Sequence, residues 1–369
     1  MRVVILSKAL VAGAYQRKLE EIARLGVELT ALVPPGWREP RVGMQRLERR
    51  YTSGYTLECL PIALNGRHHL HFYPTLGRAL RRLRPEVLHI DEESFNLATF
   101  QAMRLGVALG ARCCFYNYAN IDRYYPPPFN LFERYSFRHA AHAMACNQEA
   151  AAIIRRHGYT GPLTIVPQFG VDPELFAPGS AERRGEGLVV GFLGRLVPEK
   201  GLLDLVEAVA GLPPQVRLRL VGDGAQRPAL ERRAAQLGLG DRLELRPAVS
   251  STAVPEALRG LDVLVLPSRT TPSWKEQFGR VLIEAMSCGV PVVGSSSGEI
   301  PNVIGDAGLV FPEGDVGALR ATLARLAGEP ALRAELARRG RERVLAQFTQ
   351  AAVARRHVEV YAAMLGRTP

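Results

Sequence analysis

Lysine is scarce in this sequence: it supplies only four of the 47 basic residues, at positions 8, 18, 200 and 275, and the other 43 are arginines. No apolar run is long enough to span a bilayer. The sequence also has no D-x-D triplet, and its five cysteines show no metal-binding spacing. These absences argue against a membrane-spanning protein, and no metal site is predicted.

The cysteines and the first residues of the sequence indicate the cellular compartment of the protein. The five cysteines form an odd set, and four of them sit in apolar runs, as reduced core cysteines of a cytoplasmic protein do. The start resembles a signal peptide only superficially, because Lys8 interrupts the apolar run after too few residues. We therefore expect a cytoplasmic protein.

The net charge of +11 has three interpretations. Nucleic-acid binding is one, but no recognised module is present and the basic residues are dispersed, so no nucleic-acid partner is predicted. Attraction to an anionic membrane surface is the second, and it suits an enzyme that uses lipid-linked acceptors. A composition biased towards arginine is the third. We favour the bias, with peripheral membrane contact left open.

The chain is long enough for two domains, and strand-like and helix-like segments alternate in both halves. Between the expected strands 27–33 and 86–90, residues 34–66 are predicted to be irregular and polar. Residues 170–187 are rich in Gly, Pro and charge, which is typical of a linker. The fold class is therefore α/β, with two parallel, doubly wound sheets covered by helices on both faces. The expected domains are 1–168 and 169–347, followed by a helical end at 348–369.

The most informative stretch runs from residue 268 to 301 and reads SRTTPSWKEQFGRVLIEAMSCGVPVVGSSSGEIP. It follows an apolar strand, so its loop opens at the carboxyl edge of a sheet, where ligands bind in such folds. A helix that begins near Phe278 and Gly279 offers free N–H groups to an anion, and Gly279 allows close approach. Glu276 and Glu284 can accept hydrogen bonds from sugar hydroxyls. The alternative is an amphipathic helix with two solvated glutamates.

This stretch, with E-QFGRVLI-E-AMSCGVPVVGS followed by GEIP, closely resembles the E-x7-E region of the retaining glycosyltransferases of family 4. The resemblance covers most of the C-terminal half. It implies a GT-B fold, in which two Rossmann-like domains face a central cleft and the last helix crosses back onto the first domain. It also implies a nucleoside-diphosphate sugar as the donor substrate, with UDP or GDP left open, and no cofactor.

A second motif, GFLGRLVPEKG at residues 191–201, places Arg195 and Lys200 on one loop, where two cations suit a diphosphate. The alternative is a surface arginine and a lysine at a helix start. The resemblance implies that both bind the donor pyrophosphate and stabilise it as a leaving group. It makes Arg195, Lys200 and Glu276 the candidate catalytic residues. The candidate donor-binding residues are Gly13, Gly194, Gly222, Phe278, Gly279, Arg280, Val281 and Glu284.

The first half supplies the candidate acceptor site. After the strand that ends near Tyr116, many family members carry a histidine, but this chain offers Asn117 or Asn120. A general base at this position is therefore in doubt. The polar runs 65–74 and 89–96 are the densest outside the donor site; metal binding by their histidines and a plain exposed loop stay open as alternatives. The candidate acceptor-binding residues are Asn117, Asn120, Glu92, Glu93 and His71.

Together these patterns predict transfer of a sugar from a nucleoside-diphosphate sugar to an acceptor hydroxyl, with retention at the anomeric carbon and without a metal. The donor is expected in the cleft, mostly on the second domain. The acceptor is a glycan, a lipid-linked or a small-molecule glycoside. A nucleotide-sugar epimerase, a sugar phosphorylase and a non-catalytic binder of sugar nucleotides or polyanions stay open as alternatives.

Overall fold

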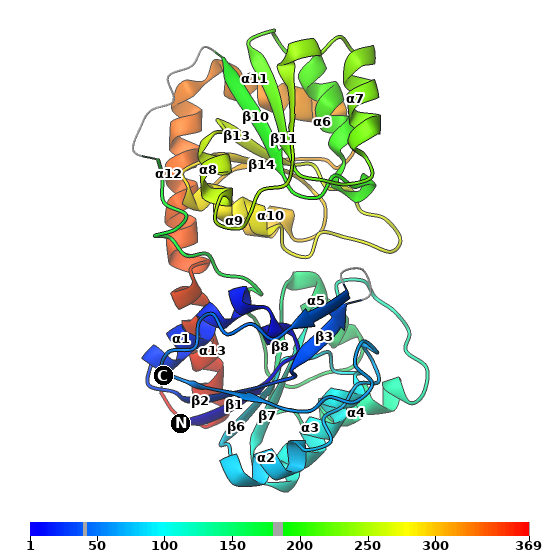
Figure 1. The fold of residues 1–369 in the computed structure, drawn as a ribbon, viewed down its shortest axis with the longest axis vertical. Helices are drawn as coiled ribbons and strands as arrows, with labels where there is room; N and C mark the ends of the chain where they lie inside the picture. Colours follow the sequence, from blue (N-terminus) through cyan, green and yellow to red (C-terminus); the bar gives the residue numbers. More distant parts are fainter. Residues whose placement is uncertain (40–42, 180–186, 369) are drawn as a thin grey trace. The chain divides into compact units, whose positions relative to one another are not determined.

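The computed structural model describes residues 1–39, 43–179 and 187–368, and it divides into two compact units (Figure 1). Unit 1 comprises Met1–Gly170 together with Gln350–Pro369. Unit 2 comprises Val171–Thr349. Both units have a parallel β-sheet with helices packed on it, so each is described by itself.

The sheet of unit 1 has seven parallel strands in the order β5-β2-β1-β6-β7-β8-β9. Its central strands are runs of buried apolar residues, as expected for strands that helices cover on both faces. The strands are β1 (Arg2–Leu6), β2 (Glu28–Val33), β5 (Thr56–Cys59), β6 (Val87–Ile90), β7 (Arg112–Asn117), β8 (His142–Ala145) and β9 (Leu163–Ile165).

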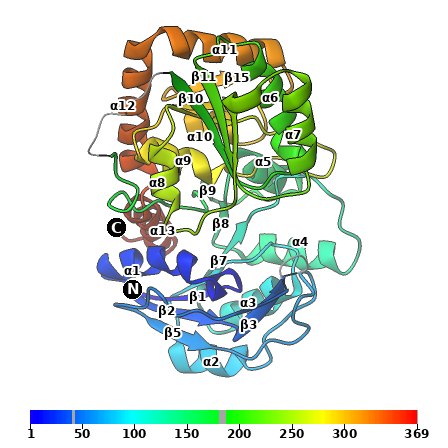
Figure 2. The same cartoon turned by 45° about the horizontal axis from the view of Figure 1, so that its top comes forward.

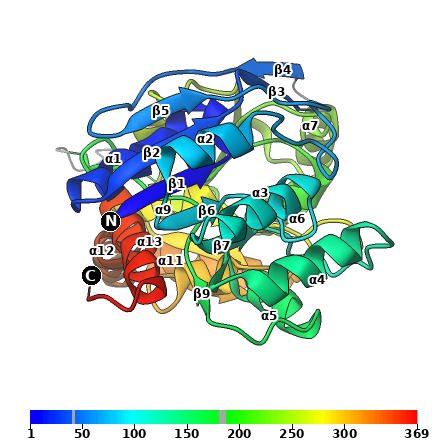
Figure 3. The same ribbon diagram turned by 90° about the horizontal axis from the view of Figure 1, so that it is seen from below.

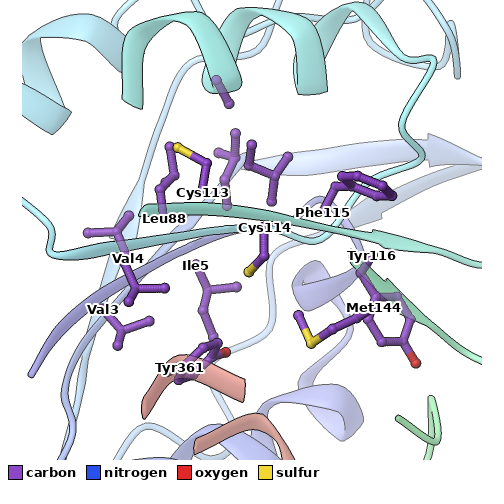
Figure 4. Packing of buried hydrophobic residues seen from close by; sticks show 14 of the residues in the cluster. Val3, Val4, Ile5, Leu88, Cys113, Cys114, Phe115, Tyr116, Met144 and Tyr361 are labelled. Atoms are coloured by element: carbon purple, nitrogen blue, oxygen red, sulfur yellow. The ribbon is translucent and has the colours of Figure 1, made fainter. Parts of the chain in front are cut away.

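The helices of unit 1 include one from the far end of the chain. That C-terminal helix packs along α1, and its Tyr361 lies against the sheet beside Ile5 and Cys114 (Figure 4). The helices are α1 (Arg17–Arg24), α2 (Leu76–Leu83), α3 (Leu97–Ala108), α4 (Phe129–His139), α5 (Gln148–Arg156) and α13 (Gln350–Met364), with short 3-10 turns η1 (Ala9–Val11) and η2 (Gly13–Gln16). Helices α2, α3 and α4 lie side by side (Figure 3).

The expectation of an irregular segment at 34–66 was wrong in part. Strands β3 (Gly36–Glu39) and β4 (Gly43–Arg46) pair as an antiparallel ribbon, and β5 pairs in parallel with β2 at the edge of the main sheet. All three strands have four residues, and β5 has only one buried residue, Leu57. Such short strands carry too little apolar periodicity for a sequence pattern to reveal them.

The sheet of unit 2 has six parallel strands in the order β12-β11-β10-β13-β14-β15. Its strands β10 and β11 lie side by side (Figure 2). Two of its four central strands, β10 and β13, are apolar runs that are almost entirely buried. The strands are β10 (Leu188–Leu193), β11 (Val216–Val221), β12 (Leu243–Arg246), β13 (Val263–Leu266), β14 (Val292–Ser295) and β15 (Leu309–Phe311). The prediction of a second parallel sheet is confirmed.

The helices of unit 2 begin and end at residues that the sequence marks clearly. Asp315 caps α11 by accepting a hydrogen bond from the amide of Ala318, and Gly289 follows the end of α9 with φ +73°. The helices are α6 (Leu202–Ala210), α7 (Arg227–Gln236), α8 (Val254–Arg259), α9 (Arg280–Ser287), α10 (Ile300–Ile304), α11 (Val316–Gly328) and α12 (Pro330–Gln347), with 3-10 turns η3 (Pro198–Lys200) and η4 (Gly240–Arg242). Residues 180–186 of the predicted linker lie outside the described part of the chain.

Candidate functional site

The loops that follow β10, β11, β13 and β14 meet at the carboxyl edge of the unit 2 sheet. A Cβ built on Gly222 would lie 1.8 Å from the carbonyl oxygen of Gly194, so these two loops pack backbone against backbone. The amide of Arg269 donates to the carbonyl of Glu199 (2.9 Å), which ties the loop after β13 to the turn η3. This edge therefore brings the two sequence motifs of the second half together.

Lys200 and Glu276 contact each other directly at this edge. The ammonium of Lys200 lies 2.5 Å from Oε2 of Glu276, and the hydroxyl of Ser268 donates to the same oxygen at 2.8 Å. The main chain of Glu276 is also fixed, because its carbonyl accepts from the amide of Glu299. Gly298 makes this approach possible, since a Cβ there would lie 2.1 Å from that carbonyl oxygen.

Trp274 covers the Lys200 ammonium on another side. The main chain of Trp274 pairs with Thr271 in a short antiparallel bridge, which turns the loop back on itself. This turn places the indole ring 4.9 Å from the ammonium nitrogen of Lys200. A cation at that distance from a ring face is attracted to it. Lys200 is thus held between a carboxylate and an aromatic ring.

Helix α9 begins at this same edge. Gly279 precedes it with φ +76°, a conformation that glycine adopts without strain, and Phe278 is buried. Arg280 forms an ion pair with Glu284 (2.9 Å) one turn further along the helix. Burial raises the pKa of the Glu284 carboxyl, and the charge of Arg280 opposes this rise. Val281 is half-buried beside them.

Arg195 is placed differently from Lys200, although both lie on the loop after β10. Its side chain is exposed and makes no hydrogen bond or ion pair within the described ranges of the chain. Lys200, by contrast, already has a counter-charge. The loop therefore offers one open cation and one paired cation to an anion.

In unit 1, Gly13 lies in the turn η2 rather than in a glycine-rich loop. Its amide donates to Oε2 of Glu48 at 3.0 Å, and a Cβ on Gly13 would lie 2.8 Å from the same oxygen. A carboxylate thus approaches the backbone at a point where the family comparison predicts a donor contact.

Three consecutive carboxylates follow β6 at the carboxyl edge of the unit 1 sheet. Asp91 accepts hydrogen bonds from Ser7 (2.6 Å) and from the hydroxyl of Tyr118. Glu92 is buried, and it pairs with the ammonium of Lys8 and lies 3.4 Å from Nε2 of His71. Burial opposes ionisation of Glu92, yet the charges of Lys8 and His71 lower its pKa to about 2.

The third carboxylate, Glu93, holds the loop after β7. Its Oε1 accepts from the amides of Tyr118 (3.0 Å) and Ala119 (2.9 Å). Its Oε2 is buried and has no hydrogen-bond partner among the described residues. Burial raises the pKa of Glu93 to about 7, although the two amides and Lys8 act against the rise. Asn117 ties the neighbouring loops together through its side chain. Its Oδ1 accepts from the backbone amide of Ser94 (2.8 Å), and its Nδ2 donates to the hydroxyl of Ser94 (3.1 Å).

The histidines of the run 65–74 have separate partners. His69 bonds Asn96 (2.9 Å), whereas His71 is buried with Nδ1 3.0 Å from the carbonyl of His68. Within residues 1–39, 43–179 and 187–368, no group of three or more His, Cys, Asp or Glu is placed to hold a metal ion. In the same part of the chain, no helix combines the length and the apolar character needed to cross a membrane.

Two family models match the chain, one for each unit. The model for the glycosyl transferase 4-like domain matches residues 12–168, and the model for glycosyl transferases group 1 matches residues 177–343. The chain belongs to the glycosyltransferases.

Curated relatives support this assignment. The chain is 27% identical over 341 residues to 2-deoxystreptamine N-acetyl-D-glucosaminyltransferase of Streptomyces fradiae, a match that covers 84% of the chain and 74% of the relative. It is 32% identical to 2-deoxystreptamine glucosyltransferase of Streptomyces kanamyceticus over 62% of each protein. It is 27% identical to the lipopolysaccharide core biosynthesis glycosyltransferase LpsE of Rhizobium meliloti over 92% of each.

Solved structures show the same fold. Sucrose-phosphate synthase of Thermosynechococcus elongatus has a TM-score of 0.72 at 20% identity and covers 99% of both chains. Anabaena Alr3699/HepE in complex with UDP has a TM-score of 0.74 at 17% identity, over 98% of this chain and all of the other. The predicted GT-B class, with two Rossmann-like units, is confirmed.

The structure also reveals residues of this glycosyltransferase that sequence reasoning missed. Lys8, Ser268 and Trp274 each contact a predicted site residue but were not assigned to a site. Lys8 carried a signal, because it is one of four lysines and lies two residues after the end of a strand at the carboxyl edge. Trp274 carried a weaker one as one of two tryptophans. Ser268 carried none.

Proposed function

We propose that this glycosyltransferase moves a sugar from a nucleoside-diphosphate sugar to an acceptor hydroxyl, with retention of the anomeric configuration and without a metal ion. The observation that carries the proposal is the meeting of Arg195, Lys200, Glu276 and the start of α9 at one sheet edge. Cations and helix N-termini bind phosphate, and carboxylates bind sugar hydroxyls. Solved neighbours of the same fold carry UDP, and one carries UDP-glucose.

In this proposal Arg195 and Lys200 bind the pyrophosphate and stabilise the charge that develops on it as it leaves. Glu276 and the main chain of Phe278 and Gly279 bind the sugar. Glu284 binds the ribose. Side chains at Arg280 and Val281 and the backbone at Gly194 and Gly222 complete the donor contacts in unit 2.

The departing phosphate is the base for the acceptor hydroxyl. It leaves from the face that the acceptor attacks, so the new bond keeps the donor's configuration and no covalent enzyme intermediate is needed. Asn117 and Asn120 stand where family members carry a histidine, and an amide cannot take up a proton at neutral pH. The absence of a D-x-D triplet supports a reaction without a bridging metal.

The acceptor binds at the carboxyl edge of the unit 1 sheet, around Asn120 and Glu93. Buried Glu92, His71 and Asn117 bond mainly within the protein, so they shape this edge and hold its loops in place. The relatives' names mention 2-deoxystreptamine in one case and lipopolysaccharide core biosynthesis in another. We infer a hydroxylated acceptor, either a glycan, a lipid-linked glycan or a small glycoside.

Membrane contact is proposed for one face of unit 1, the outer surface of α2, α3 and α4 (Figure 3). The only acidic residue on these helices, Glu133, is buried and bonds Ser94 and His157. Val107 and Leu131 are exposed between the basic side chains. These helices therefore expose charge of one sign, although Arg82 pairs with Glu58 of β5, and such a surface suits an anionic membrane. Its exposed arginines are Arg78, Arg81, Arg82, Arg104, Arg134 and Arg138.

Vesicle sedimentation tests this face. The protein should bind vesicles that contain phosphatidylglycerol at least tenfold more strongly than neutral phosphatidylcholine vesicles, and binding should weaken as salt is added. Replacing Arg81, Arg134 and Arg138 together by Gln should abolish the preference. A triple Arg→Gln variant on unit 2, at Arg217, Arg227 and Arg232, is the matched control and should keep it. Equal binding by both variants would refute the assignment.

The function itself is tested by donor and acceptor panels. The melting temperature should rise with UDP or GDP, because a ligand of the folded state stabilises it by mass action. A cleavable sugar nucleotide should then be consumed only when a suitable acceptor is present. Conversion of the nucleotide sugar without any acceptor would favour an epimerase, and dependence on free phosphate would favour a phosphorylase. Lack of any nucleotide effect would remove the proposal.

A further inference from the structure

The Lys200–Glu276 pair joins two residues that the proposed function assigns to different parts of the donor. Their side chains are only 14% and 10% exposed, and the contact measures 2.5 Å. Ser268 donates to the same carboxylate oxygen, so the pair is anchored on the Glu276 side. The main chain of both residues is fixed by the loop contacts of this edge, at Gly201 against Pro267 and at Gly298 against Glu276. The contact is therefore built into the site.

This pairing has opposite consequences for two ligands that share a diphosphate. An ammonium is a compact charge with three donors, and a diphosphate placed against it also meets the Glu276 carboxylate. A bare nucleoside diphosphate must compete with that carboxylate for Lys200 and is repelled by it. A nucleotide sugar brings hydroxyls that donate to the same carboxylate, which compensates for the lost contact with Lys200.

We propose that Glu276 is a specificity-determining residue that competes with the diphosphate for Lys200. It thereby weakens binding of the nucleoside diphosphate product relative to the nucleotide sugar and favours product release. This inference rests on the proposed function, because it concerns the same donor site. If the donor site bound substrate and product equally well, slow product release would limit turnover. In this arrangement the affinity of the site for a diphosphate depends on whether the sugar is attached.

Trp274 makes the competition testable. Its ring lies 4.9 Å from the Lys200 ammonium and is independent of the carboxylate. When the charge of Glu276 is removed, the ring still attracts the ammonium, so Lys200 stays at the edge with a free positive charge. The Glu276→Gln substitution keeps the size of the side chain and its ability to accept from Ser268. It therefore removes the competing charge with little change in shape.

The experiment is calorimetric titration of UDP and GDP into the wild type, Glu276→Gln, Lys200→Met and the double variant. Glu276→Gln should bind the preferred diphosphate about three- to tenfold more tightly than the wild type, a factor that corresponds to roughly 0.7–1.4 kcal/mol. The same substitution should weaken binding of the matching nucleotide sugar. In the Lys200→Met background the gain for the diphosphate should disappear, because the competition needs the ammonium.

Glu313→Gln is the matched control, since Glu313 lies at the same edge but bonds Thr270 instead of Lys200. It should leave the affinity for the diphosphate within about twofold, because a charge away from the ligand is screened. If the Gln variant at Glu276 lacks the wild-type circular dichroism, Glu276→Ala takes its place, with the same expected tightening.

Each outcome is decisive. Failure of the wild type to bind either diphosphate would overturn the proposed function and this inference with it. Binding by the wild type with unchanged or weaker binding by Glu276→Gln would overturn the inference alone. An equal gain in the Lys200→Met background, or with Glu313→Gln, would show that general charge repulsion acts and that Lys200 is not the object of competition.

Discussion

The imidazole Nδ1 of His89 lies 2.7 Å from the hydroxyl oxygen of Tyr361, and this contact joins the centre of the unit 1 sheet to α13, which is 272 residues away in the sequence. His357 lies on the same helix with its ring centroid 5.6 Å from that of His89. Both histidines are buried, and Nε2 of each has no partner among the described residues. Two neutral histidines are therefore buried where strand β6 packs against α13.

The first prediction is that His89 makes unit 1 sensitive to acid. Burial lowers the pKa of His89 to about 4, with the charge of Asp91 acting against it. The unfolded chain takes up this proton below about pH 6.5, so the free energy of unfolding decreases as the pH falls from 6.5 to 4 and then no further from this group. His89→Asn, which can still bond Tyr361, should lose less of its melting temperature over this range than the wild type does.

His139 provides the matched control for this comparison. It lies near the surface and bonds the carbonyl of Tyr135 at 2.9 Å. The melting temperature of His139→Asn should follow the wild-type curve between pH 6.5 and 4. A His89→Asn curve that also runs parallel to the wild type would contradict the buried neutral state of His89.

Glu93 should give the free energy of unfolding a pH dependence of opposite sign to that of His89. Its pKa of about 7 lies above the value of 4.5 that a free glutamate has, and burial is the main cause. The unfolded chain therefore releases this proton first, and the free energy of unfolding decreases as the pH rises from 4.5 to 7. Glu93→Gln should not show this decrease. Melting curves of both proteins between pH 4.5 and 8 test it, and a constant difference between them would be the contrary result.

Glu92 is the contrasting case in the same cluster. Its pKa of about 2 lies below that of a free glutamate, so its contribution is present above pH 4.5 and is lost as the pH falls towards 2. Glu92→Gln should therefore destabilise the protein at neutral pH, because it leaves the Lys8 ammonium without its counter-charge. We therefore expect Glu93 to change the free energy of unfolding between pH 4.5 and 7, and Glu92 to change it between pH 4.5 and 2.

Sequence patterns predicted the fold well where buried strands are long and apolar. β10 and β13 are nearly continuous apolar runs, and the glycine after α9 marked its end. Sequence patterns did not predict β5, which has four residues and lies at a sheet edge. The site was predicted as a set of residues but not as a set of contacts. Lys200 meets Glu276 across 76 positions, and Lys8 meets Glu92 across 84, so only the folded sheet brings them together.

The next prediction concerns metal ions. Glycosyl transfer should continue in an excess of EDTA, because Arg195 and Lys200 supply the positive charge that a bridging cation would otherwise provide. The assay compares initial rates with and without chelator at matched ionic strength, since salt itself screens these charges. Loss of activity that Mg²⁺ or Mn²⁺ restores would exclude the proposed arrangement.

Replacement of Lys200 by Ala should lower kcat by about a hundredfold or more, the scale for losing one preorganised group that stabilises developing charge. Arg232, an exposed cation on α7 of the same unit, is the matched control, and Arg232→Ala should leave kcat unchanged. The melting temperatures of both variants show whether they fold. Near-normal turnover of folded Lys200→Ala would remove this residue from the mechanism.

The last prediction concerns the base. If the departing phosphate takes the acceptor's proton, neither Asn117 nor Asn120 has to transfer one. Asn117 is bonded through both ends of its amide to Ser94, so Asn117→Ala should destabilise unit 1 by about 1–3 kcal/mol and slow turnover. It should not move the pH optimum, because no titrating group is lost. Asn120→Ala should weaken acceptor binding, again without a shift in the optimum. An NMR spectrum of the new linkage should show the donor's anomeric configuration. An inverted product would demand a base opposite the leaving group and would redirect attention to Glu93, whose pKa of about 7 and unpartnered oxygen make it the carboxylate best suited to that role.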